Sequence, residues 1–135
     1  MIILSHEQFT NLVEYSKNSL PNEACGLLGG SLNGDIRLVE KLYFLKNADE
    51  SPEHFSMNAA EQFAAVKNMR LNGWQLLGNF HSHPNSPARP SKEDIRLVFD
   101  RRLSYLILSL NEAPSLKSFR FDHDKNFVEE EICFQ

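Results

Sequence analysis

Two histidines one residue apart are the side chains in this sequence best placed to do chemistry. His81 and His83 end an apolar run that predicts a β-strand. Alternate residues of a strand face the same side, so both imidazoles can reach one ion. Asp94 follows eleven residues after His83, in the first turn of a predicted helix, and a loop of this length can return it to the strand end. Two histidines and one carboxylate form the three-ligand shell of a catalytic zinc, with the fourth position left for water.

A zinc-bound water also needs a group that accepts its proton and delivers that proton to a leaving amine. Glu23, just before the apolar segment 24–30, is the best acidic candidate, although the chain holds many glutamates. The alternative is that Glu23 is only a solvated charge after Pro21. The residue types alone therefore leave the choice of acid open.

The same residues also have purely structural interpretations. His81 and His83 could be strand histidines whose nitrogens are satisfied by backbone groups. Ser91 and Asp94 have the spacing of a capping box, which stabilises a helix by about 1 kcal/mol. The capping and ligand roles can coexist, because a capped first turn also fixes the position of a ligand.

The combined pattern resembles a known family. Glu23, then His81-Ser82-His83-Pro84, then Ser91-x-x-Asp94 is similar to the JAMM (MPN+) metallopeptidase signature, and the segment 21–29 is similar to the one that carries the family's glutamate. The resemblance covers nearly the whole chain, and every signature position is filled at the family spacing. It implies an MPN/JAB domain, a helix-flanked mixed sheet similar to that of cytidine deaminases.

The resemblance also implies a role for each site residue. His81, His83 and Asp94 would bind one Zn²⁺, Glu23 would hold and deprotonate the water, and Ser91 would help stabilise the oxyanion. The reaction would be hydrolysis of a peptide or isopeptide bond without a covalent intermediate. The small prokaryotic members process the C-terminal tail of ubiquitin-like or sulfur-carrier proteins, so we expect such a protein as the partner and substrate.

Two other functions stay open from the sequence. One is a non-catalytic protein-binding scaffold of the MPN type, against which the complete motif argues. The other is a small-molecule zinc amidohydrolase or deaminase, although the Pro-Cys-x-x-Cys ligand pair of deaminases is absent. Asn79 stands where relatives of the family often have a bulky apolar residue, a departure that concerns the substrate groove and the packing.

Length and composition limit the remaining classes. A chain of 135 residues fits one domain over 1–135, able to bury a core without a disulfide or metal. The content of 41% hydrophobic and 24% charged residues excludes a disordered tail, a collagen repeat and a coiled coil. The formal net charge of -4 provides no basic footprint for nucleic acid or an anionic membrane. Two distant cysteines indicate a reducing compartment, and no signal peptide or long apolar run is visible, so we expect a cytoplasmic protein.

Periodicity and turn signals predict an α/β fold with a mixed sheet. The expected elements are a helix over 6–18, strands over 24–30 and 36–45 joined at Asn33-Gly34, a helix between Asn58 and Gly73, a strand over 74–81, a helix opening at Ser91, a central strand over 103–110, a strand around 118–121 and a last strand over 127–133.

Four further expectations concern individual side chains. The second helix carries Phe63, Val66 and Arg70 on one stripe. The third helix turns Ile95, Val98 and Phe99 inward. Cys25 belongs to the core rather than acting as a nucleophile. The run 129–131, three glutamates, forms a solvated edge that discourages aggregation.

Overall fold

The computed structural model describes all 135 residues and contains eight strands and three helices. The strands are β1 (Ile2–Leu4), β2 (Cys25–Asn33), β3 (Ile36–Leu45), β4 (Gln75–His83), β5 (Ser104–Ser109), β6 (Ser115–Phe121), β7 (Phe127–Glu130) and β8 (Ile132–Phe134). The helices are α1 (His6–Ser19), α2 (Ala59–Leu71) and α3 (Lys92–Arg96). The predicted mixed α/β fold is confirmed.

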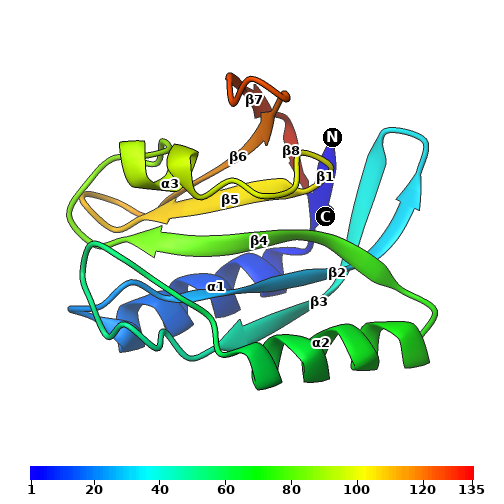
Figure 1. Cartoon of the computed structure of the whole chain (residues 1–135), viewed down its shortest axis with the longest axis horizontal. Helices are drawn as coiled ribbons and strands as arrows, with labels where there is room; N and C mark the ends of the chain where they lie inside the picture. The colour runs from blue at the N-terminus through cyan, green and yellow to red at the C-terminus, as the bar shows by residue number, and fades with distance from the viewer.

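All eight strands form one mixed sheet in the order β7-β6-β5-β4-β2-β3-β1-β8 (Figure 1). β4 pairs parallel to β5 and antiparallel to β2, and β1 pairs parallel to both β3 and β8. The expectation that 103–110 is the central strand is wrong, because β5 lies third from one edge and β4 and β2 occupy the middle. The short β1 was not predicted as a strand; it fits between β3 and β8, where Ile2 and Leu4 are fully buried.

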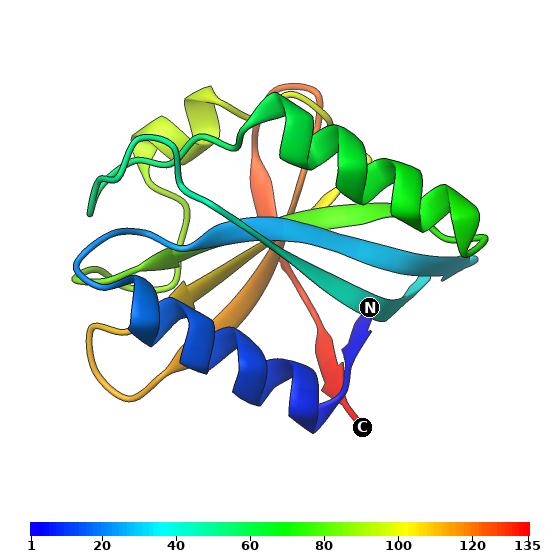
Figure 2. The same ribbon diagram turned by 90° about the horizontal axis from the view of Figure 1, so that it is seen from below.

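The helices cover the two faces of the sheet (Figure 2). α1 covers one face, where Leu12 packs in a core with Leu28, Phe80 and Leu106. α2 and α3 lie over the other face. His81 and His83 of β4 lie on this second face, which α2 and α3 cover only in part (Figure 2).

Each helix begins at a side-chain cap. The Ser5 side chain accepts from the Gln8 amide, and the Gln8 side chain accepts from the Ser5 amide, which is the capping box expected for α1. Asn58 caps α2 and Ser91 caps α3 in the same way through their side-chain oxygens. These caps satisfy amide groups that have no partner within the helix.

Glycine is required at two places for different reasons. Gly34 has a φ of +62° in the turn between β2 and β3, as the Asn33-Gly34 hairpin signal predicts. Gly78 lies against β5 so closely that a Cβ atom would stand 2.1 Å from the Ser104 carbonyl oxygen. The absence of a side chain therefore lets β4 and β5 pair at this point.

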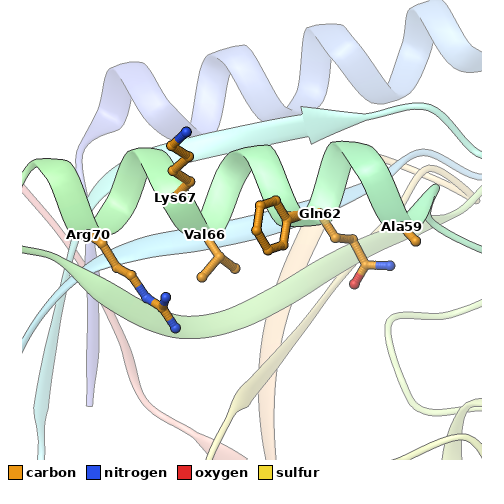
Figure 3. Close-up of a pocket in the computed structure, with 6 residues that line it drawn as sticks. Ala59, Gln62, Val66, Lys67 and Arg70 are labelled. Carbon is orange, nitrogen blue, oxygen red and sulfur yellow. The ribbon is translucent and has the colours of Figure 1, made fainter.

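Phe63, Val66 and Arg70 lie along one side of α2, as predicted, but this side faces away from the sheet (Figure 3). The helix packs on the sheet through Ala65 and Met69, which are 5% and 1% exposed, whereas Phe63 is 73% exposed. Phe63 and Val66 line a shallow surface hollow on the outer side of α2, together with polar residues such as Lys67 (Figure 3). Apolar residues occur on two sides of this helix, so periodicity alone could not identify the buried one.

The third helix is shorter than expected. α3 ends at Arg96, so Val98 and Phe99 belong to the segment that follows it. Ile95 and Val98 pack against a core cluster as predicted, but Phe99 is 77% exposed. The inward position assigned to Phe99 is therefore wrong, because the helix on whose period it rests ends at Arg96, three residues earlier.

The C-terminal segment also differs from expectation. The predicted strand 127–133 is two strands, β7 and β8, which lie at opposite ends of the strand order although only Glu131 separates them. The sheet must therefore curl until its two edges meet. Glu130 is 8% exposed at this point, so the three-glutamate run is not a fully solvated edge.

Candidate metal centre

The candidate site lies at the carboxyl end of β4. His81 and His83 end this strand on one face of the sheet, and both are buried. The loop that follows leads to α3, whose third residue is Asp94. Because Ser91 caps the helix at its first turn, the carboxyl of Asp94 is held at a fixed place beside the end of β4.

The ligand atoms of these three side chains converge on one point. The Nε2 atoms of His81 and His83 lie 3.0 Å apart, and each lies 3.1 Å from Asp94 Oδ2. Ligand atoms about 2.0–2.1 Å from a tetrahedral zinc are separated by about 3.3–3.4 Å. The donor types and their spacing thus fit a zinc ion with small adjustments, and they form the candidate metal group of the structure.

The orientations of the two imidazoles are fixed by different neighbours. His83 Nδ1 lies 2.9 Å from the Pro87 carbonyl oxygen, which can only accept, so Nδ1 carries a proton and the lone pair of the neutral ring is at Nε2. The His81 ring stacks on Phe55 with 4.7 Å between ring centroids. His81 Nδ1 is buried and has no hydrogen-bond partner.

The hydrogen bonds within the group act on the ionisation of Asp94 and His83. Burial opposes the charged carboxylate of Asp94, but the hydrogen bonds to His81 and His83 outweigh it and hold its pKa well below the usual range. Burial also opposes a charged His83, yet its hydrogen bonds to Asp94 and the Pro87 carbonyl raise its pKa. Asp94 therefore offers an ionised oxygen to the site.

Glu23 reaches the same site from a distant part of the sequence. β2 and β4 are antiparallel with Cys25 opposite His81, so continuing the register by two residues places Glu23 across from His83. Ser82 holds this alignment: its Oγ accepts from the Ala24 amide at 2.8 Å, and its own amide donates to the Ala24 carbonyl at 2.9 Å. Among the many glutamates of the chain, the tertiary structure thus brings this one to the histidines.

The carboxyl of Glu23 is buried without a protein partner for one of its oxygens. The residue is 4% exposed, and Oε1 has no hydrogen bond. Its backbone is held by Ser51, whose carbonyl accepts from the Glu23 amide, and by Asn47, whose side chain donates to the Glu23 carbonyl. Burial raises the pKa of Glu23 to about 8, the charge of His83 lowers it and that of Asp94 raises it further. The interpretation of Glu23 as a solvated charge is wrong.

Ser91 lies at the mouth of the site and keeps one hydrogen-bonding capacity free. Its Oγ accepts from the Asp94 amide at 3.0 Å, and its own amide donates to Asp94 Oδ2 at 2.9 Å. The predicted capping box is therefore present. The Ser91 side chain is exposed, and its hydroxyl hydrogen is not used by the cap.

Cys25, beside this site in sequence, belongs to the core as predicted. It is fully buried, and burial raises the pKa of its thiol to about 12. A thiol with such a pKa stays protonated at neutral pH and is a poor nucleophile. Both cysteines of the chain are free.

Three supporting residues were not assigned a role from the sequence. Pro87 fixes the protonated nitrogen of His83, Phe55 stacks on His81, and Ser82 ties β4 to the segment after Glu23. Only Ser82 carried a signal, since it separates the two histidines. The contacts of Pro87 and Phe55 depend on loop paths that no local pattern specifies.

The fold and this group define the chain as a mixed α/β domain with a candidate His-His-Asp metal centre. A family model described as prokaryotic homologues of the JAB domain matches residues 5–122. The chain therefore belongs to this family, as the sequence resemblance indicated. None of its helices has the length and apolar character needed to cross a membrane.

Two named relatives and one solved structure are similar to this chain over most of its length. A protein named desampylase from Pyrococcus furiosus is 30% identical over 130 residues, which is 96% of this chain and 86% of the relative. A CysO-cysteine peptidase from Mycobacterium tuberculosis is 25% identical over 122 residues, covering 89% of this chain and 82% of the relative. A solution structure of a Desulfitobacterium hafniense protein is 56% identical, with a TM-score of 0.93, and the match covers 100% of this chain and 93% of that one.

Proposed function

We propose that this protein is a zinc metallopeptidase that hydrolyses the amide bond after the C-terminal tail of a ubiquitin-like or sulfur-carrier protein. The observation that carries the proposal is the convergence of His81, His83 and Asp94 with Glu23 across from them. The names of two relatives, a desampylase and a CysO-cysteine peptidase, support cleavage of such a conjugate.

His81 and His83 would hold one Zn²⁺ per chain through Nε2, and Asp94 would hold it through Oδ2. Bound there, zinc would supply a Lewis acid that polarises the scissile carbonyl and lowers the pKa of water. The hydrogen bond from His83 Nδ1 to the Pro87 carbonyl oxygen favours the tautomer that a metal ligand needs. In the neutral ring the lone pair is therefore at Nε2, the atom that lies beside His81 and Asp94.

Glu23 would act as the general base and then as the general acid. Its carboxylate would accept a proton from the attacking water and pass it to the nitrogen of the scissile bond, so that this nitrogen leaves as a neutral amine and not as an amide anion. A pKa raised by burial makes the carboxyl a better proton acceptor than an exposed glutamate. Ser91 would donate its free hydroxyl hydrogen to the oxygen that becomes negative in the transition state.

We further propose that the protein acts as one domain in the cytoplasm. Its two free cysteines are compatible with a reducing compartment.

Metal analysis of purified variants tests the site. We expect one zinc per chain in the wild type and its loss in His83→Ala and Asp94→Ala. The exposed pair His123→Ala and Asp124→Ala are the matched controls and should keep the ion. An unchanged zinc content in the two site variants would contradict the ligand assignment.

Cleavage of a carrier fusion tests the role of Glu23. We expect Glu23→Gln to keep zinc and to lose at least about 100-fold in kcat, because a general base contributes about 10²–10⁴-fold. Glu14→Gln, on the exposed side of α1, is the matched control and should cleave at the wild-type rate. A Glu23→Gln variant with full activity would refute the proposed base, and binding without cleavage by the zinc-loaded wild type would favour a scaffold.

A further inference from the structure

A second feature lies beside the candidate metal centre, a hollow of about 190 Å³ between α2 and the segment after α3. His81 and Asp94 form its edge, and neither Glu23 nor His83 lines it. Its walls are apolar and come from Phe55 and Met57 on one side and Leu97 and Phe99 on the other. The hollow therefore extends along β4 from His81 toward Asn79, whereas Glu23 lies across from His83 at the end of the strand.

Asn79 is the unusual residue of this hollow. It lies two residues before His81 on β4, so both side chains face the same side of the sheet. It is 5% exposed, and its Oδ1 is buried without a hydrogen-bond partner. Leaving a buried polar atom unpaired opposes folding, so such an atom in a native structure requires an explanation.

Two other polar side chains line the hollow, and each already has a hydrogen bond within the protein. The Tyr105 hydroxyl donates to the Asp100 carbonyl at 2.8 Å, and the Gln62 side chain donates to the Met57 carbonyl at 3.0 Å. Rotation of the Asn79 amide about its terminal torsion can turn either its oxygen or its NH₂ group toward the hollow. Of these side chains, Asn79 is thus the one that has a buried polar atom without a partner for a ligand atom to satisfy.

We propose that Asn79 is a specificity-determining residue that selects an uncharged polar side chain, a hydroxyl or a carboxamide, in the tail of the substrate. The proposal rests on the peptidase function proposed above. Since Glu23 serves the leaving amine and the hollow extends along β4 away from the strand end where Glu23 lies, the selected side chain lies on the acyl side of the scissile bond. Asn79 and His81 are two residues apart on β4, a distance of about 7 Å along a strand. An extended substrate tail covers the same distance in two residues, so the selected side chain belongs to the residue two or three positions before the scissile bond.

The apolar walls and the unpaired amide of Asn79 limit what the hollow accepts. A hydroxyl or carboxamide satisfies the amide while its carbon atoms contact Phe55 and Leu97. A charged side chain has no opposite charge there except Asp94, which the metal group already engages. An apolar side chain fills the space but leaves Asn79 unpaired.

Isosteric substrate pairs test the proposal. Carrier fusions with Thr or Val, and with Asn or Leu, are placed at each of the two tail positions, and kcat/KM is measured for the zinc-loaded protein. We expect the wild type to prefer the polar member at least tenfold at one position. Asn79→Leu should reverse that preference. Asn79→Thr, which replaces the carboxamide by a hydroxyl, should retain part of it. Asn11→Leu, exposed on α1, is the matched control and should behave as wild type.

Calorimetric affinities of the corresponding tail peptides provide a second readout that needs no cleavage. If the wild type binds the polar peptide tenfold more tightly and Asn79→Leu abolishes this difference, the proposal is supported even when no fusion is cleaved. The lack of cleavage would then refute only the peptidase function. Equal binding and equal cleavage of both members of each pair would overturn it. A polar preference that persists in Asn79→Leu would overturn the proposal as well. It would mean that Asn79 has only a structural role, since a residue with such a role does not affect the ratio of kcat/KM between two substrates.

Discussion

The carboxyl of Glu23 lies where its charged form is not favoured. It is buried beside the end of β4, and one of its oxygens has no protein donor. Such an environment stores a proton-accepting capacity that a solvated glutamate lacks. At the scale of single residues, the proposed role of Glu23 therefore depends on desolvation as much as on residue type.

The raised pKa of Glu23 predicts a pH dependence of stability for the metal-free protein. Because its folded-state pKa of about 8 exceeds the ordinary value of 4.5, its contribution is complete below pH 4.5 and is lost as the pH rises through 8. We expect the free energy of unfolding to fall over this range, and Glu23→Gln to remove that part of the fall. Urea unfolding of both proteins at a series of pH values measures it. Parallel pH curves for the two would contradict the prediction.

The elements carry the site through their ends rather than their middles. β4 ends at His83, α3 begins just before Asp94, and β2 begins just after Glu23. An element end can be fixed by a cap or a register contact while its side chains stay open to a ligand. The five-residue α3 is held by the Ser91 cap, which shows that a short helix suffices to position one carboxylate.

The packing of α2 predicts opposite effects for two of its residues. Met69 is 1% exposed against the sheet and Phe63 is 73% exposed. We expect Met69→Ala to lower the free energy of unfolding by about 2–5 kcal/mol, because it leaves a cavity. Phe63→Ala should change it by less than about 0.5 kcal/mol. Denaturant unfolding measures both, and equal losses would mean that α2 packs differently.

At the scale of the whole molecule, Glu130 joins the parts of the sheet that curl together. Its Oε1 accepts from the hydroxyls of Ser104 at 2.7 Å and Ser118 at 2.8 Å. Its Oε2 lies 3.6 Å from the amino group of Met1 and 3.7 Å from Arg120. One buried carboxylate thus connects β5, β6 and β7 with the start of the chain.

This connection predicts that Glu130 contributes far more to stability than its neighbour. Glu130→Ala leaves buried hydroxyls and cations without their partner and should cost about 3–5 kcal/mol in the free energy of unfolding. Glu129→Ala removes only an exposed pair with Lys117 and should cost less than about 1 kcal/mol. Thermal or denaturant unfolding compares the two. Similar losses would show that Glu130 does not hold the sheet edges.

The sequence by itself determined the features that depend on short-range order. His81, His83, Ser91 and Asp94 fall within a short segment, so strand alternation and a capping box already place them near one another. Helix starts and the hairpin at Gly34 follow in the same way from local caps and turns. These patterns involve neighbours a few residues apart, whose geometry the backbone fixes.

The tertiary structure alone decided which distant groups meet. The contact between Ala24 and Ser82 joins residues 58 apart in the chain, and it selects Glu23 from the other glutamates. The buried side of α2 and the burial of Glu130 depend likewise on how the sheet curls and on which surfaces it offers. Strand register and desolvation arise only when separate elements pack together, and neither leaves a periodic signal in the chain.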